Sequence, residues 1–218
     1  MRTSDLEARE RRGIQVAKFL DQNIYPQKIE NWFQKEPYYH WVRNFKKTSP
    51  FEGSEIKIET KEQVYYLHEH ICPYTEELTF LLPIYAVKKK RGLKKEYYSF
   101  LLEEDAKNHI DFYCFYQEQD GEITGVHGFF VPRKKLQSFL TERGVTQERI
   151  YQGIKQGKRW KEDTIWTLSS EGKGIWKEGY LYAVPSLRSR MIFLGLREEI
   201  FTSLAVHKLS VTENHSFV

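Results

Sequence analysis

The sequence predicts an α+β protein with N-terminal helices, a central mixed β-sheet flanked by helices, and a small C-terminal helix-plus-β-hairpin module. Two observations predict this class. Apolar residues recur at helical spacing near the N-terminus, and from about residue 51 the period changes to the alternation typical of strands. The short helices and glycine-containing turns after residue 143 favour two units: a core, residues 1–143, and a small helix-plus-β-hairpin module, residues 144–218.

Two helices are predicted before the strands begin. Ser4 and Asp5 are suited to cap the first helix, over about residues 6–20, because their side chains accept hydrogen bonds from the first turn. Pro26 is suited to begin the second helix. Proline has no backbone N–H, and the N–H groups of the first helical turn have no partner within the helix. The aromatic and basic segment 38–45 is compatible with a further short helix.

The middle of the chain is predicted to be mostly strand. Asp120 and Gly121 indicate a tight hairpin, and Pro83 indicates an edge position or a bulge within its strand. A helix is expected after the hairpin, over residues 133–144. The stretches with strand character are 55–72, 78–87, 96–104, 109–118 and 122–132.

The last third is expected to alternate short elements. A helix over about 146–157 would be capped by Thr146 and ended by Gly157. Two or three short strands are expected within 164–185, and a last helix over about 189–204.

Composition indicates a folded chain with a mildly basic surface. Of the 218 residues, 40% are hydrophobic, and the net charge of +4 is compatible with a polyanionic partner. Cys72 and Cys114 are too few for a disulfide framework, and no apolar leader precedes them, so we expect free thiols and a cytoplasmic location. No apolar run approaches the roughly 18 residues that cross a bilayer, so no membrane is expected as a partner.

His68, His70 and Cys72 would share one face of a strand, and imidazole and thiolate are good zinc ligands. Alternate residues of a strand lie about 6–7 Å apart, however, so one strand surrounds a single ion poorly. We therefore expect a histidine-rich strand end at the surface rather than a zinc site.

Glu55 and Lys57 form the first candidate catalytic pair. Their Glu-x-Lys spacing places both on one strand face, together with Glu59. A Mg²⁺-dependent nuclease uses carboxylates to hold the metal and a lysine near the attacked phosphate. The alternative is an ordinary solvated strand face, which has the same pattern.

Four segments in order resemble the core of the PD-(D/E)xK nucleases, over about residues 10–140. They are a helix with Gly13, a strand ending in YAVKK, a strand IDFYCFY, and a hairpin to FFVPRKKL. The resemblance implies Lys88 as the catalytic lysine, although Ala86 stands where that family has Glu, Asp or Gln. Glu76 and Glu77 are the nearest acids, so Glu77 with Lys88 is the second candidate pair.

Basic residues concentrate in two clusters, which predict binding to nucleic acid, with double-stranded DNA as the first candidate. Lys and Arg that neutralise phosphates supply most non-specific affinity for nucleic acid. The alternative is a solvated basic surface. The first cluster comprises Lys88, Lys89, Lys90, Arg91, Lys94 and Lys95, and the second comprises Arg133, Lys134, Gln147, Arg149, Lys155, Lys158 and Arg159.

The sequence thus leads to one main hypothesis and two rivals. The main one is a Mg²⁺-dependent endonuclease, with Glu55 and Glu77 as metal ligands and a homodimer that supplies one site per DNA strand. The first rival is a non-enzymatic DNA-binding regulator or an accessory factor of replication or mobile elements. The second is a protein–protein adaptor, for which no salt-sensitive binding of polyanions is expected.

Overall fold

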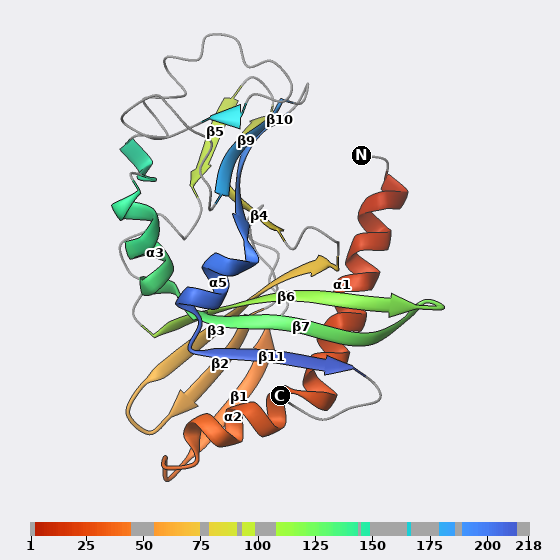
Figure 1. Cartoon of the computed structure of the whole chain (residues 1–218), viewed down its shortest axis with the longest axis vertical. Helices are drawn as coiled ribbons and strands as arrows, with labels where there is room; N and C mark the ends of the chain where they lie inside the picture. Colours follow the sequence, from red (N-terminus) through yellow and green to blue (C-terminus); the bar gives the residue numbers. More distant parts are fainter. Residues whose placement is uncertain are drawn as a thin grey trace.

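The fold is α+β, as the sequence predicts (Figure 1). A computed structural model describes residues 3–44, 55–74, 79–90, 93–98, 108–143, 145–148, 165–166, 179–185 and 189–212. Side chains are described for residues 11–43, 56–74, 80, 82, 108–143, 145–148 and 193–211.

Four helices and eleven strands make up the described part of the chain. The helices are α1 (Thr3–Asn23), α2 (Tyr25–Phe33), α3 (Arg133–Glu142) and α5 (Glu198–Leu204). The first strands are β1 (Tyr39–Asn44), β2 (Glu55–Thr60), β3 (Val64–Pro73), β4 (Thr79–Lys90) and β5 (Leu93–Tyr98). The later strands are β6 (His109–Gln119), β7 (Glu122–Pro132), β8 (Ile165–Trp166), β9 (Gly179–Pro185), β10 (Ser189–Arg197) and β11 (His207–Thr212).

The strands form two sheets that cut across the expected division at residue 143. One has the order β1-β2-β3-β6-β7-β11, and it is mixed because β3 and β6 run parallel. The other has the order β5-β4-β10-β9-β8. Strand β10 pairs with β4, and β11 pairs with β7, so late strands complete both sheets. Among the described residues, the strands after residue 144 therefore belong to sheets that they share with earlier strands.

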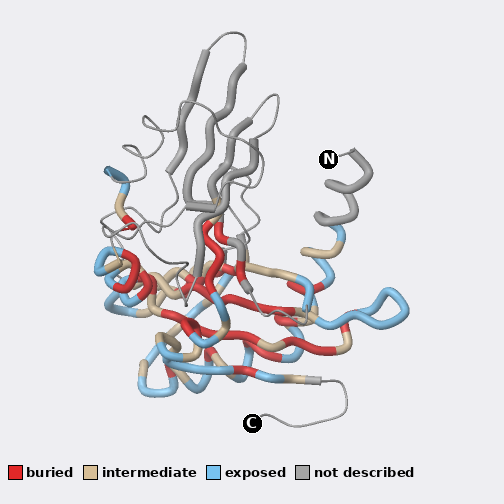
Figure 2. The backbone as a smooth tube through the Cα atoms, turned by 45° about the horizontal axis from the view of Figure 1, so that its top comes forward, coloured by how far each residue is buried: buried red, intermediate tan, exposed pale blue. Residues whose placement is uncertain are grey.

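The six-stranded sheet lies between two apolar cores. Helices α1 and α2 cover one face, with Val16, Leu20 and Tyr25 packed on the Phe112 and Phe130 rings of β6 and β7. On the opposite face, α3, α5, β4 and β10 cover Tyr113 and other residues of β6 and β7. Burial is accordingly greatest along β6 and β7 (Figure 2).

The turn chemistry follows the sequence closely. Asp120 and Gly121 both have positive φ, at 53° and 87°, which is the conformation of a two-residue turn between antiparallel strands. Pro83 lies beside a register shift between β4 and β10, at Ile192 and Phe193, so the predicted bulge is present. Within the described residues, strand β5 pairs with β4 from Tyr85 onwards.

Three expectations about elements need correction. The segment 38–45 contains strand β1 rather than a helix, because Tyr39, Trp41 and Arg43 alternate toward the helix-covered face. Residues 189–197 form strand β10, and the helix α5 begins only at Glu198. Strand β11 was not expected. The helix expected over 146–157 lies mostly outside the described residues.

None of the helices in the described part of the chain is both long enough and apolar enough to cross a membrane.

Candidate functional sites

The lysines of the first basic cluster lie opposite one another in the β4–β5 hairpin. The register pairs Lys88 with Lys95 and Lys89 with Lys94, and Lys90 with Leu93. We call these five lysines the basic hairpin. Like charges directly opposite each other destabilise a sheet.

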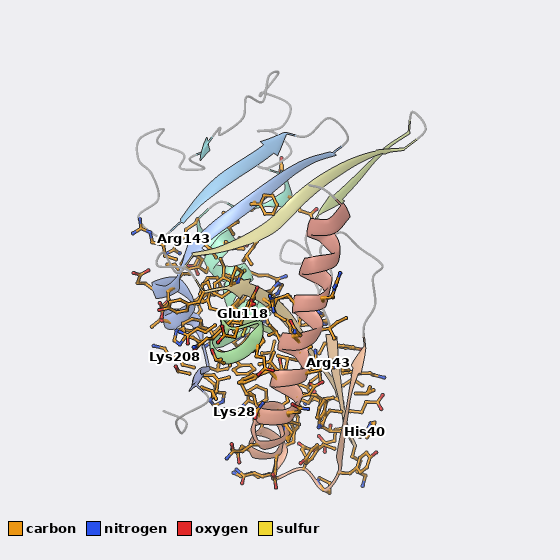
Figure 3. All side chains as sticks on the ribbon, turned by 90° about the vertical axis from the view of Figure 1, so that its right-hand side faces the viewer. Lys28, His40, Arg43, Glu118, Arg143 and Lys208 are labelled. Atoms are coloured by element: carbon orange, nitrogen blue, oxygen red, sulfur yellow. The ribbon has the colours of Figure 1, made fainter. Side chains whose placement is uncertain are left out.

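The end of the basic hairpin projects as a two-stranded ribbon. Strand β10 begins at Ser189, which pairs with Lys88, so Lys89 and Lys90 lie beyond the start of β10. In Figure 3 the yellow-green ribbons of β4 and β5 reach farther than the blue ribbons of β9 and β10. Arg91 lies outside the described residues.

A second candidate site lies on the face of the six-stranded sheet opposite α1 and α2. Alternation brings His68 and His70 of β3 to the same face as His109 and Asp111 of β6. Arg133, the first residue of α3, adds its guanidinium. We call these five residues the imidazole cluster.

Asp111 is the centre of the imidazole cluster. Its side chain is fully buried, and Arg133 donates hydrogen bonds to both carboxylate oxygens, at 3.0 Å from Nε and 2.8 Å from Nη2. His70 Nε2 lies 3.0 Å from Asp111 Oδ1. Burial alone would raise the pKa of Asp111, but the hydrogen bond from His70 and the charge and hydrogen bonds of Arg133 lower it below its ordinary value. Asp111 is therefore ionised at neutral pH and fixes the orientation of His70.

The two remaining imidazoles form a stacked pair beside this centre. The rings of His68 and His109 are 5.1 Å apart and nearly parallel, with His68 Nε2 2.9 Å from His109 Nδ1. Arg133 Nη1 also lies 3.0 Å from His109 Nδ1, so that nitrogen accepts. Burial, followed by the charge of Arg133, lowers the pKa of His68 from 6.5 to about 3. His68 is therefore neutral at physiological pH.

The first predicted catalytic pair lies at the edge of the imidazole cluster. The register places Glu55 opposite His68 and Lys57 opposite Tyr66, on the same face of the sheet. Lys57 is paired with Glu59, and both side chains are partly exposed. Glu77 of the second predicted pair lies outside the described residues, and Lys88 lies in the separate five-stranded sheet.

The described side chains include no group of three or more His, Cys, Asp and Glu that is placed to hold a metal ion. His68, His70 and Cys72 do share a face, as the sequence predicts, but the two histidines bond to His109 and Asp111. The carboxylates predicted to hold Mg²⁺, Glu55 and Glu77, are not among the described side chains. Neither cysteine is in a disulfide; Cys114 is buried and Cys72 is partly buried.

The helix-covered face of the same sheet holds a second buried arginine. Arg43 Nη1 donates to Glu69 Oε2 at 2.5 Å, and Arg43 Nη2 donates to Asp21 Oδ1 at 2.6 Å. Tyr25 donates its hydroxyl to Glu69 at 2.5 Å. We call these four residues the anchor cluster, because they join α1, α2, β1 and β3. Arg43 lies between α1 and the strands in Figure 3.

The second basic cluster is only partly described. Arg133, predicted to bind nucleic acid, is 3% exposed and bound to Asp111, so it lies inside the imidazole cluster and not on a basic surface. Lys134 and Gln147 are exposed. The remaining predicted contacts, Arg149, Lys155, Lys158 and Arg159, lie outside the described residues.

The sequence predicts part of the imidazole cluster but does not predict which of its residues are in contact. His109 and Asp111 indicate an acid–base pair, with His127 as a third candidate, but the histidine that contacts Asp111 is His70. His127 instead contacts Glu198 of α5, at 3.0 Å. The signal was the shared i, i+2 spacing of His68-x-His70 and His109-x-Asp111, which becomes a cluster once β3 and β6 pair in parallel.

The fold and its sites define the chain as an α+β protein with two sheets, a projecting basic hairpin and a partly buried imidazole cluster. Comparison with protein-family models, with curated proteins and with solved structures gives no match for this chain.

Proposed function

We propose that this protein binds nucleic acid through the basic hairpin. Double-stranded DNA is the first candidate. The observation that carries the proposal is the register that places Lys88 opposite Lys95 and Lys89 opposite Lys94. Two rows of cations on one ribbon repel each other in the free protein, whereas phosphates neutralise them in a complex.

A simpler role for lysines is to prevent aggregation at the edge of a sheet. Strand β5 is an edge strand of the five-stranded sheet, so this role accounts for Lys94 and Lys95. It leaves Lys88 unexplained, because that residue of β4 has both β5 and β10 as neighbours. Nucleic-acid binding accounts for the lysines of both strands.

Replacement of Lys89, Lys90 and Arg91 together by Gln tests the proposal. Each lost phosphate contact lowers the salt slope of binding by about 0.9, so we expect the triple variant to bind a DNA duplex roughly 100-fold more weakly at low salt. The measurement is fluorescence anisotropy with a labelled duplex. Replacement of Lys18 and Lys208 by Gln is the matched control, because both are exposed lysines outside the hairpin. Equal affinities for the two variants would contradict the proposal.

A second candidate function is Mg²⁺-dependent cleavage of DNA, on a homodimer with one site per strand. The observation that favours it is the placement of Glu55 and Lys57 on the face of the sheet that holds the ionised Asp111 and three imidazoles. In this proposal Glu55 and Glu77 hold Mg²⁺, and Lys57 stabilises the charge that develops on the attacked phosphate. Lys88 is the alternative lysine.

Incubation of the protein with supercoiled plasmid, in Mg²⁺, Mn²⁺ or EDTA, tests the cleavage proposal. A nuclease is expected to nick or linearise the plasmid in either metal and not in EDTA. Glu55→Gln is then expected to lower the rate at least 100-fold while duplex affinity stays within about twofold. A salt-sensitive gel shift without cleavage would leave a non-enzymatic DNA-binding protein, which is the rival proposal.

A further inference from the structure

His70 and Asp111 of the imidazole cluster form a pair of the kind that orients a catalytic base. His70 Nε2 donates to Asp111 Oδ1 at 3.0 Å, across the parallel strands β3 and β6. Arg133 donates to both oxygens of the same carboxylate, so the orientation of the acceptor is fixed. Because the Nε2 proton is directed at Asp111, the lone pair of a neutral His70 imidazole is on Nδ1.

The plane of the His70 ring is held as well. It stacks on the ring of Tyr113, with the ring centroids 4.6 Å apart and the planes 13° from parallel. Tyr113 is fully buried and packs on Phe80 and Phe201. The hydrogen bond and the ring contact together fix the direction and the plane of the imidazole, which is the preorganisation that a general base needs.

The His70 side chain is also accessible from one side. It is 14% exposed, whereas Asp111 and Tyr113 are fully buried. The same face of the sheet continues into β2 and β1, where the side chains of Lys57 and Val42 are 33% and 42% exposed. Solvent therefore reaches this part of the face, and Lys57 places a cation there that suits a phosphate.

The same sheet holds a second pair of histidine and carboxylate, which differs in its surroundings. His127 Nε2 lies 3.0 Å from Glu198 Oε1, the same distance as in the first pair. The side chains of His127 and Glu198 are 27% and 29% exposed, so water competes for both groups and screens their interaction. His127 is therefore a matched control for His70.

We propose that His70 is the general base of the proposed phosphodiester cleavage, with Asp111 and Arg133 as positioning residues. His70 Nδ1 takes a proton from the attacking water while the water oxygen bonds to phosphorus. The bond from phosphorus to one sugar oxygen breaks, and that oxygen takes a proton from solvent. This inference rests on the proposed cleavage of DNA, whichever of Lys57 and Lys88 stabilises the phosphate.

Replacement of His70 tests the assignment by kinetics. In Mg²⁺, His70→Ala is expected to lower kcat for plasmid cleavage by about 10²–10⁴-fold and to change KM by less than about twofold. Added imidazole is expected to restore part of the lost rate, because it substitutes for the missing side chain. His127→Ala is expected to keep the wild-type kinetics. The melting temperature of each protein shows whether it is folded.

A double-mutant cycle tests the two positioning residues. Asp111→Asn is expected to lower kcat and to leave KM unchanged, because the amide holds the imidazole less firmly. Added to His70→Ala, it is expected to cause no further loss, since it acts only through His70. Additive losses would assign Asp111 a purely structural role. Arg133→Lys keeps the positive charge and takes the place of Asp111→Asn in the cycle if that variant does not fold.

Chemical modification without metal tests whether DNA reaches His70. Diethyl pyrocarbonate acylates accessible imidazoles, and mass spectrometry identifies the residue that is modified. In EDTA, a short DNA duplex is expected to prevent most of the modification of His70 and to leave that of His127 unchanged.

The outcomes separate this inference from the function on which it rests. If the wild-type protein cuts no plasmid in Mg²⁺ or Mn²⁺, the proposed cleavage fails and the inference fails with it. If it cuts, and His70→Ala cuts at the same rate, the cleavage stands and His70 is not its base. A loss in His70→Ala that imidazole does not restore, or equal modification of His70 with and without DNA, would also overturn the assignment.

Discussion

The two faces of the six-stranded sheet each hold a buried arginine, and they use it differently. Arg43, beneath α1 and α2, is bound by Glu69 and Asp21, and Tyr25 completes the anchor cluster. Arg133, on the other face, is bound by Asp111, and histidines complete the imidazole cluster. Both guanidiniums are nearly inaccessible, at 6% and 3% side-chain exposure.

The difference concerns which groups change charge as the pH falls. Burial alone would lower the pKa of Arg43, but its hydrogen bonds to Asp21 and Glu69 outweigh burial and raise that pKa. Burial and the charge of Glu69 raise the pKa of Tyr25 well above its ordinary value. Arg43 and Tyr25 therefore keep one charge state over the physiological range. The imidazole cluster instead holds His68, whose pKa is lowered to about 3 by burial and by the charge of Arg133, so its folded and unfolded states differ in charge below pH 6.5.

Replacement of either buried arginine is expected to lower the free energy of unfolding more than the other changes. Arg43→Met and Arg133→Met each leave a buried carboxylate uncompensated, which costs about 3–5 kcal/mol of unfolding free energy. Arg133→Met also removes a positive charge that lowers the pKa of His68, so its loss is expected to be smaller at pH 4.5 than at pH 7. Denaturant unfolding at the two pH values measures this difference, and an equal loss at both values would contradict the influence of Arg133 on His68.

Packing on the helix-covered face gives the next largest effect. A Cβ at Gly128 would lie 2.6 Å from the Phe112 ring and 2.8 Å from the Tyr113 carbonyl oxygen, and the backbone atom cannot move aside cheaply. Gly128→Ala is expected to cost about 1–3 kcal/mol. Gly13→Ala is the matched control, because nothing lies within 4 Å of its Cβ and alanine favours the helix by up to about 1 kcal/mol. Thermal unfolding should therefore move in opposite directions for the two variants.

The last prediction sharpens the comparison through His68 alone. Its pKa is lowered from 6.5 to about 3, so the unfolded chain binds more protons than the folded chain below pH 6.5. This contribution to stability is complete above pH 6.5 and is lost as the pH falls toward 3, by at most about 1.4 kcal/mol per pH unit. His68→Gln is expected to flatten that part of the stability profile. An unchanged slope between pH 6.5 and 4 would show that His68 is not the group responsible.

Local chemistry was predictable where one residue decides it. Pro26 lies at the start of α2, Asp120 and Gly121 form the turn, and Pro83 marks the bulge. The structure of segments that depend on residues far away in the sequence was not predictable. Trp41 and Arg43 are in a strand because β2 pairs with β1 and the helix-covered core receives their side chains. Strand β10 is a strand because β4 lies beside it.

The candidate sites divide in the same way. The lysines of the basic hairpin lie close together in the sequence, so the sequence alone located them. Their cross-strand pairing could be assigned only from the strand register in the structure. The imidazole cluster draws on β3, β6 and α3, and no spacing within the sequence brings Arg133 to Asp111. For that reason Arg133 was expected among the phosphate contacts and is found buried.

The central claim is that the basic hairpin binds nucleic acid, and the salt dependence of duplex affinity for the wild-type protein tests it most directly. Anisotropy of a labelled DNA duplex, at several salt concentrations and without metal, gives the logarithm of the association constant against the logarithm of salt. With about five phosphate contacts, the account predicts a straight line of slope near −4.5. A slope near zero, or no binding at the lowest salt, would contradict the claim and leave edge protection as the role of Lys94 and Lys95 of β5.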